Sequence, residues 1–205
     1  MGELQRLDDS LMVDVNHLAW HTAWLHTPLV DYAHYGVVLF AALLLGGVFL
    51  ARNSPSRRLA AAGWTPLAMF IALGLNQPLG RWVAEPRPYQ THPWLLVLAS
   101  RTSDFSFPSD HAVMAGAVAA GLLLVSHWLG TIASVAAGVM AFSRVYIGAH
   151  YPWDVVGGLL LAAVVTVLGW LLLQKPLTAL TEWLRHQRSL QAGFAQTLSS
   201  LEREE

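Results

Sequence analysis

SRVYIGAHYPWD, residues 143–154, lies between two long apolar runs of the chain. It contains Arg144, His150 and Asp154. Ionisable side chains are costly inside a membrane and usually have a function there. An arginine, a histidine and an aspartate together at a membrane boundary therefore indicate an anion-binding site with an oriented nucleophile.

The apolar residues fall into long blocks. The chain has 205 residues, of which 55% are hydrophobic and 12% charged. The blocks match the length of a membrane-spanning helix, which needs about 20 apolar residues. The sequence therefore predicts an all-α integral membrane protein, a compact bundle of about five transmembrane helices. The predicted spans are residues 35–51, 59–79, 112–128, 131–149 and 155–173.

The flanking segments are more polar. Residues 1–34 mix apolar with charged and histidine side chains, which predicts an N-terminal helix lying in the membrane interface. The alternative is a further span that carries several neutral histidines, at the cost of burying them. Residues 35–174 form the predicted transmembrane bundle, with a connection over 80–109 that rests on the interface. Residues 175–205 form a C-terminal cytoplasmic tail, predicted as an amphipathic helix with a frayed acidic end.

Lys and Arg near the span ends predict the orientation. With five spans, the N-terminus, residues 80–111 and residues 143–154 all lie on one side. The opposite side holds the basic turn of residues 52–58 and Lys175. Because cytoplasmic loops carry the excess of Lys and Arg, we expect the polar clusters to face away from the cytoplasm, in a cell membrane crossed several times.

Composition excludes some partners and favours others. A net charge of −1 gives no indication of a basic surface that would bind nucleic acid. The absence of cysteine excludes disulfides and thiolate metal sites. Several of the nine tryptophans stand near block ends, as in the aromatic belts of membrane proteins. The expected partners are the lipid bilayer and a lipid-linked phosphate substrate.

Two further polar clusters end apolar runs on the same side of the membrane. The first contains Arg87, which, like Arg144, offers a planar fork of donors to phosphate oxygens. The second contains Ser109 and Asp110, where a helix is predicted to begin. Free N–H groups at a helix N-terminus bind anions. These four residues therefore predict a phosphate-binding site.

Histidines in two of the clusters supply the chemistry. His111 and His150 carry imidazoles that act near neutral pH. Asp154 follows in the first turn of a predicted helix, where it can hold His150 in one tautomer, as a carboxylate does in hydrolase triads. A phosphate clamp, a nucleophile and an orienting acid together predict phosphoryl transfer.

Each residue alone also has a purely structural interpretation. Asp154 is favoured at a helix start by the helix dipole. Arg87 can anchor a span at the headgroups, and Ser109 can be an N-cap. The occurrence of all these residues on one side of the membrane favours the functional interpretation.

The three clusters resemble a known family. Ser143-Arg144, five residues, His150, three residues and Asp154 match the third signature of the type 2 phosphatidic acid phosphatase superfamily. Residues 108–111, Pro-Ser-Asp-His, resemble its second signature, Pro-Ser-Gly-His. Arg87-Pro88 resembles the end of its first, Lys-(six residues)-Arg-Pro. The resemblance covers about residues 60–175.

This resemblance implies a helical bundle with a metal-free site and no cofactor. It implies that His150 is the nucleophile and forms a phosphohistidine, that Asp154 orients it, and that His111 protonates the leaving group. The implied phosphate ligands are Arg87, Arg144 and Ser109.

Two positions depart from the family pattern. The lysine of the first signature falls on Gly80, and Arg81 stands one residue later as a candidate replacement. Asp110 replaces the usual glycine and places a carboxyl beside a phosphate site, so it must point away, be protonated or be paired. The run Ser-Phe-Pro-Ser-Asp-His, residues 106–111, is similar to that of the bacterial undecaprenyl pyrophosphate phosphatases linked to bacitracin resistance. We therefore expect hydrolysis of a polyprenyl pyrophosphate to the monophosphate.

Several alternatives remain open from the sequence. One is a phosphatidate or phosphatidylglycerophosphate phosphatase, which performs the same chemistry on another lipid. Another is a vanadium haloperoxidase, which shares the motifs but whose relatives are soluble. A third is a non-catalytic lipid-binding or transport homologue, which a phosphate-release assay distinguishes. A metal hydrolase with His and Asp ligands is a fourth, and activity that survives a chelator dismisses it.

Overall fold

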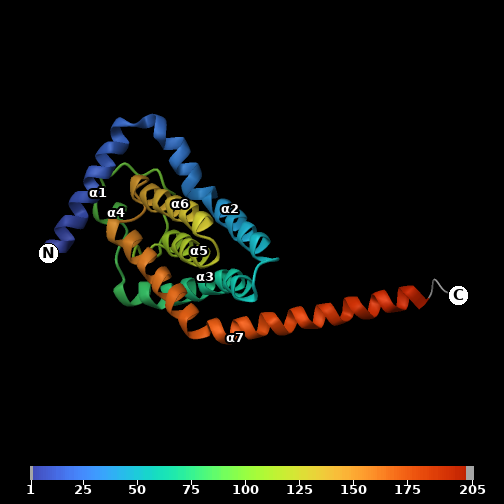
Figure 1. The fold of residues 1–205 in the computed structure, drawn as a ribbon. Coiled ribbons are helices and arrows are strands. Elements are labelled where there is room, and N and C mark those ends of the chain that lie inside the picture. Colours follow the sequence, from blue (N-terminus) through green and yellow to red (C-terminus); the bar gives the residue numbers. More distant parts are fainter. Residues whose placement is uncertain (1, 202–205) are drawn as a thin grey trace.

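The regular elements of the described chain are all helices (Figure 1). The computed structural model describes residues 2–201, except for the side chains of residues 188–190 and 192–201. The elements are α1 (Glu3–His21), η1 (Ala23–Leu25), α2 (His26–Ala51), α3 (Ser56–Val83), α4 (Pro88–Thr91), α5 (Asp110–Val125), α6 (His127–Tyr146) and α7 (Pro152–Leu201).

Helix α5 is the centre of the bundle. It contacts α2, α3, α6 and α7, and most of its residues are buried. Its 16 residues span about 24 Å at 1.5 Å per residue, less than the hydrocarbon thickness of a bilayer. Gly116 explains how closely a neighbour approaches, because a Cβ there would lie 3.1 Å from the Ala162 Cβ on α7.

The predicted spans correspond to five helices. Four described segments are long and apolar enough to cross a membrane: Ala23–Ala51, Ser56–Thr91, His127–Tyr146 and Pro152–Gln187. The remaining predicted span, residues 112–128, corresponds to the shorter apolar helix α5. These helices confirm the predicted all-α membrane bundle. Helix α1 is not among the four long apolar segments.

Several helix boundaries differ from the prediction. A turn at Thr22 separates α1 from the rest, and α2 begins at His26. Residues 26–34 therefore continue the first span rather than the N-terminal segment. Between α5 and α6 the chain turns at Ser126, whose side chain accepts a 3.5 Å hydrogen bond from Leu129 N. The extended conformation of Ser126, with φ −156° and ψ 122°, ends α5 at Val125, before residue 128, the predicted end.

The C-terminal tail is not a separate helix. Helix α7 continues without a break through Pro176 to Leu201. Arg185 of this extension donates hydrogen bonds to the carbonyls of Arg52 (2.9 Å) and Ser54 (2.8 Å) in the α2–α3 turn. The predicted frayed acidic end falls on residues 202–205, which lie outside the described part of the chain.

The connection between α4 and α5 packs under α1. Asn16 of α1 exchanges two hydrogen bonds with the backbone of Leu96, of 2.9 and 3.1 Å. Leu95 is buried in a cluster with Met12 and Tyr151. The apolar patch 94–98, predicted to rest on the membrane interface, therefore packs partly against the protein's own N-terminal helix, while Trp94 is 53% exposed.

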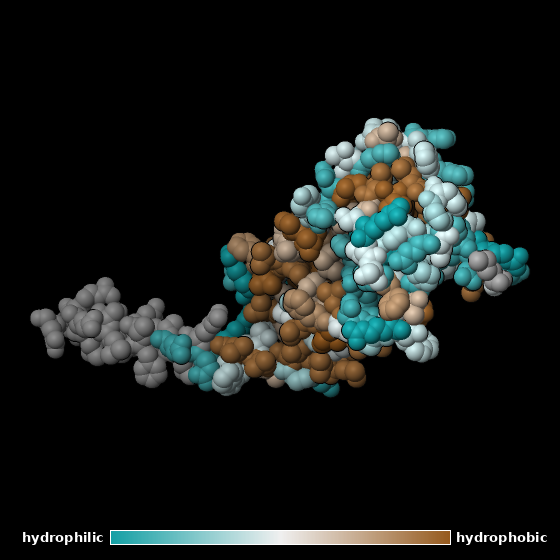
Figure 2. Space-filling view, turned by 180° about the vertical axis from the view of Figure 1, so that it is seen from behind, coloured by the Kyte–Doolittle hydropathy of each residue, from teal (hydrophilic) through white to brown (hydrophobic). Residues whose placement is uncertain are grey.

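The polarity of the surface changes along the length of the bundle. Figure 2 shows hydrophobic residues over the middle of the molecule and hydrophilic residues over the end that holds α1. Exposed apolar side chains on α3 include Phe70, Ile71 and Leu75. An exposed apolar band of this kind is the lipid-facing surface of a membrane protein.

Candidate active site

Three segments meet at the end of the bundle that α1 covers (Figure 1). Helix α3 ends at Val83 because Ala84 takes a left-handed conformation, with φ 52°. The chain then reaches Arg87, the N-cap of α4. Ser109 is the N-cap of α5, and residues 147–151 connect α6 to α7. The three predicted polar clusters are thus neighbours in space.

A glycine turn carries the chain from α6 to His150. Gly148 has φ 74°, and a Cβ there would lie 2.9 Å from the Leu96 carbonyl oxygen. Both facts favour glycine at this position. The turn is tied to the α4–α5 connection by Leu98 N–H, which donates a 3.0 Å hydrogen bond to Ile147 O. The backbone that carries His150 is therefore held on both sides.

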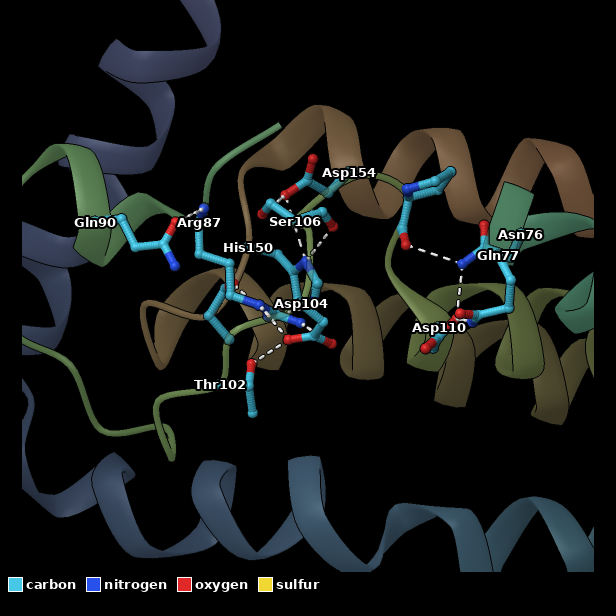
Figure 3. A network of polar contacts seen from close by, with 12 residues as sticks. Asn76, Gln77, Arg87, Gln90, Thr102, Asp104, Ser106, Asp110, His150 and Asp154 are labelled. Atoms are coloured by element: carbon cyan, nitrogen blue, oxygen red, sulfur yellow. Dashed lines mark hydrogen bonds and ion pairs between the residues drawn. The ribbon is translucent and has the colours of Figure 1, made fainter. Parts of the chain in front are cut away.

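His150 is buried and contacts two other segments (Figure 3). Its Nδ1 lies 2.9 Å from the carbonyl oxygen of Ser106, and its Nε2 lies 3.2 Å from Arg87 Nη1. A carbonyl only accepts and a guanidinium only donates, so these partners assign the proton to Nδ1 and the lone pair to Nε2. Burial, together with the positive charges of Arg144 and Arg87, lowers the pKa of His150 well below its usual range. The imidazole is therefore neutral near pH 7.

Asp154 lies behind His150 in the first turn of α7. Its Oδ2 is 3.4 Å from His150 Nδ1 and accepts hydrogen bonds from Ser106 Oγ (2.5 Å) and Tyr151 N–H (2.7 Å). Asp154 Oδ1 is buried without a hydrogen-bond partner. The carboxylate therefore faces the same imidazole nitrogen as the Ser106 carbonyl, and the serine hydroxyl holds it there.

Arg87 is oriented by several partners. Its Nε and Nη2 donate to the two carboxylate oxygens of Asp104, at 3.2 and 2.9 Å. Its Nη1 also donates to the Ala149 carbonyl at 2.9 Å. Burial acts to raise the pKa of Asp104, but the hydrogen bonds from Thr102 and Arg87 outweigh it, and the pKa is lowered. Asp104 is therefore ionised near pH 7, and the guanidinium of Arg87 lies against His150 Nε2.

A cavity of about 160 Å³ opens in front of His150. Arg144 lines it, and the Nε of Arg144 is buried without a hydrogen-bond partner. Ser109 Oγ is likewise buried and unpartnered. Unpaired buried donors are costly, and a bound phosphate would satisfy them. The full lining is Arg87, Ser100, Thr102, Asp104, Phe105, Pro108, Asp110, His111, Arg144 and His150.

Asp110 is paired, one of the three arrangements expected from the sequence. Its Oδ1 accepts hydrogen bonds from the side-chain amides of Asn76 (2.7 Å) and Gln77 (3.2 Å) on α3 (Figure 3). Arg81, the candidate replacement for the family lysine, does not line the cavity in front of His150. It lines an adjoining cavity together with Asp110.

The sequence interpretation missed two residues of the site. Ser106 contacts both His150 and Asp154, and Asp104 pairs with Arg87. Both lie in the connection before α5, where no periodicity marks a buried side chain. The one available signal was the position of Ser106 directly before Phe107-Pro108 in a recognised motif.

The apolar helices bring a neutral histidine and two arginines together at one end of the bundle. This arrangement defines the class of the protein, an integral membrane phosphatase. A family model described as the PAP2 superfamily matches residues 61–177, more than half of the chain. The chain belongs to this family.

Named relatives agree with this class. The chain is 32% identical to undecaprenyl-diphosphatase BcrC of Bacillus subtilis over 152 residues, which are 74% of this chain and 76% of that protein. An undecaprenyl-diphosphatase of Sulfolobus acidocaldarius is 32% identical over 103 residues, half of each chain. The crystal structure of a transmembrane PAP2 type phosphatidylglycerolphosphate phosphatase from Bacillus subtilis shares the fold, with a TM-score of 0.58 at 22% identity over 82% of this chain and 85% of that one.

These findings confirm the predicted enzyme class and the membrane fold. The protein is a phosphatase that is embedded in the membrane.

Proposed function

We propose that the protein hydrolyses a polyprenyl diphosphate of the undecaprenyl type to the monophosphate, through a phosphohistidine at His150. The observation that carries the proposal is the tautomer of His150. Hydrogen bonding at Nδ1 places the lone pair on Nε2, beside Arg87 in the cavity. A neutral imidazole whose lone pair is oriented in this way is a nucleophile.

The terminal phosphate is bound by groups that the free protein leaves unpaired or exposes to the cavity. Arg87 and Arg144 offer charge-assisted hydrogen bonds to its oxygens. Ser109 Oγ and Arg144 Nε gain the partners that they lack. Donors fixed around the transferred group stabilise the charge that develops on its oxygens in the transition state.

Two displacements complete the reaction. In the first, the His150 Nε2 lone pair forms a bond to the terminal phosphorus, and the bond from that phosphorus to the bridging oxygen breaks, leaving its electron pair on the lipid phosphate. In the second, water attacks the phosphohistidine, the P–N bond breaks and its pair returns to Nε2. His111, which lines the cavity, accepts the proton of this water as general base. Asp154 stabilises the positive charge that His150 carries between the two steps.

The relatives support the choice of lipid. Two of them are named undecaprenyl-diphosphatases, and BcrC matches over about three quarters of its length. In the second signature this chain has Asp110 in place of the usual glycine. The resulting run, residues 106–111, is similar to that of the bacterial undecaprenyl pyrophosphate phosphatases, which favours the same substrate class.

The basic end of the bundle supports an active site at the outer face of the cell membrane. Arg52, Arg57 and Arg58 lie in and beside the α2–α3 turn, at the end opposite the site (Figure 1). Arg185 packs against this turn. An excess of Lys and Arg marks the cytoplasmic side, so the site faces away from the cytoplasm.

Phosphate release by the purified protein tests the substrate. Undecaprenyl diphosphate, phosphatidate and phosphatidylglycerophosphate are compared in the same detergent, with His150→Ala as the control for contaminating phosphatases. We expect the highest kcat/KM for the diphosphate. A higher value for either glycerolipid would assign the protein to that lipid instead.

A further inference from the structure

The cavity in front of His150 has a neighbour of about 200 Å³. Four residues line both cavities: Asp104, Phe105, Pro108 and Asp110. The remaining lining of the second cavity comes from the last turns of α3 and from Phe107. These residues are Asn76, Gln77, Gly80, Arg81 and Phe107. The two cavities therefore share a wall and form adjacent spaces.

Gly80 keeps the second space open. A Cβ at this position would lie 3.1 Å from the carbonyl oxygen of Phe107. This distance is tighter than most Cβ contacts, so any side chain here would crowd the wall of the cavity. The position that carries lysine in the family signature is therefore free of a side chain, and the nearest cation on α3, Arg81, serves the second cavity.

The charges of the second cavity are unevenly distributed. Asp104 is paired with Arg87, which also lines the first cavity, and Asp110 is held by the neutral amides of Asn76 and Gln77. Among the residues that line the second cavity, Arg81 is the one that carries a positive charge. Its side chain is exposed and faces a space bounded by two carboxylates.

We infer that the second cavity holds the leaving phosphate of a diphosphate substrate, and that Arg81 binds this phosphate and thereby selects diphosphates over monoesters. The inference rests on the proposed function, because it places the terminal phosphate against His150 and the second phosphate next to it. Arg81 is then a specificity residue and not a replacement for the lysine that would bind the transferred phosphate.

Charge explains why a diphosphate needs this arginine and a monoester does not. The leaving group of a monoester is an alcohol, which brings no charge toward Asp104 and Asp110. The leaving group of a diphosphate brings a charged phosphate toward the same carboxylates. A guanidinium fork offers two parallel donors to phosphate oxygens. A hydrogen bond to a charged group is stronger than one between neutral groups. Because Arg81 is exposed, we expect the loss of its side chain to cost only about tenfold.

Two substrates with the same lipid tail isolate this effect. Geranylgeranyl diphosphate and geranylgeranyl monophosphate differ by the second phosphate alone. In Arg81→Gln we expect kcat/KM for the diphosphate to fall about tenfold and that for the monophosphate to change less than about twofold. Arg101→Gln is the matched control, since Arg101 is an exposed arginine at the same end, with its guanidinium 5.7 Å from the Tyr89 ring and outside both cavities.

A binding measurement separates this inference from the proposed function. In a His150→Ala background, which lacks the proposed nucleophile, we expect the diphosphate to bind more tightly than the monophosphate and Arg81→Gln to remove the difference. Equal losses on both lipids would assign Arg81 to the transferred phosphate, and no loss on either would make it a headgroup anchor. Either result overturns the inference. Failure of the wild type to hydrolyse diphosphates would overturn the proposed function, while the binding comparison would still decide the role of Arg81.

Discussion

Ser106 Oγ lies 2.5 Å from Asp154 Oδ2, and both residues are fully buried. The carbonyl of the same serine accepts the Nδ1–H of His150 at 2.9 Å. One residue of the α4–α5 connection thus contacts both the proposed nucleophile, His150, and the carboxylate behind it. Such supporting contacts keep reactive groups in their productive geometry.

The hydroxyl of Ser106 is therefore predicted to be a positioning group. Ser106→Ala removes a hydrogen bond to a carboxylate but keeps the backbone carbonyl, so we expect kcat to fall about tenfold, the equivalent of about 1.4 kcal/mol. KM should change little, because Ser106 does not line the cavity. Steady-state kinetics with Ser103→Ala, an exposed serine of the same connection, provide the control. An unchanged kcat, or a loss that appears in KM alone, would show that the hydroxyl does not position the catalytic pair.

Substitution of the catalytic pair separates the nucleophile from its orienting group. His150→Ala should reduce turnover to near background, because the variant lacks the proposed nucleophile and His111, the other imidazole of the cavity, is assigned to proton transfer. Asp154→Asn should retain more activity, because the Ser106 carbonyl still accepts the Nδ1–H. The measurement is phosphate release by variants that elute as the wild type does in gel filtration. Comparable activity in His150→Ala would reject the phosphohistidine mechanism.

The sequence predicted the parts of this structure that depend on local signals. Apolar blocks identify membrane helices because the bilayer requires about 20 apolar residues for each. Arg87, His111, Arg144 and His150 were recognisable because charged and histidine side chains are rare at the ends of such blocks. All four line one cavity.

The rest depends on tertiary contacts that no local pattern reports. Ser106 is buried and bonded to residues more than forty positions away. The patch 94–98 appears interfacial by composition, yet α1 packs against part of it through Asn16 and Met12. The one-residue offset of Arg81 from the family lysine becomes interpretable only when the two adjoining cavities are seen.

The burial of Asp8 predicts that the stability of the protein depends on pH. It is 6% exposed on α1, and its Oδ1 accepts a 2.9 Å hydrogen bond from Trp153 N–H. Burial, together with the nearby carboxylates of Asp154 and Glu85, raises the pKa of Asp8 to about 7, although the hydrogen bond from Trp153 opposes the shift. The unfolded value is about 3.9. The folded state therefore binds the proton more tightly, so stability from this group is present below about pH 4 and is lost as the pH rises to about 7.

Asp8→Asn tests this dependence, because the amide oxygen keeps the acceptor and removes the charge. We expect the melting temperature of the wild type in detergent to fall between pH 4 and pH 7 by more than that of the variant. Asp14→Asn, an exposed position on the same helix, is the control. Parallel curves for wild type and Asp8→Asn would contradict the assignment.

Single cysteines test the orientation, since the chain contains no cysteine of its own. Asn53 is exposed in the α2–α3 turn, and Ser103 is exposed at the end that holds the site. The basic turn predicts that a membrane-impermeant maleimide labels Ser103→Cys in intact cells and Asn53→Cys only after lysis. The reverse pattern would place the active site on the cytoplasmic side.

The leaving group determines how much the reaction needs His111. A phosphomonoester expels an alkoxide, which requires a proton from an acid. A lipid diphosphate expels a lipid phosphate whose second pKa is about 6, so this group departs largely unprotonated at neutral pH. His111 lines the cavity next to His150, within the space that the reacting phosphate would occupy. The contribution of a general acid should therefore appear mainly on monoesters.

His111→Ala is accordingly expected to lose about 10²–10⁴-fold on phosphatidate, the usual contribution of general acid catalysis. On a polyprenyl diphosphate the loss should be smaller, because the acid is not needed for departure and His111 then serves only the attack of water on the phosphohistidine. Wild type and variant are measured on both lipids at pH 7, and the ratio of the two losses is the quantity of interest. Equal losses would mean that His111 assists a step common to both substrates, and the leaving-group argument would then fail.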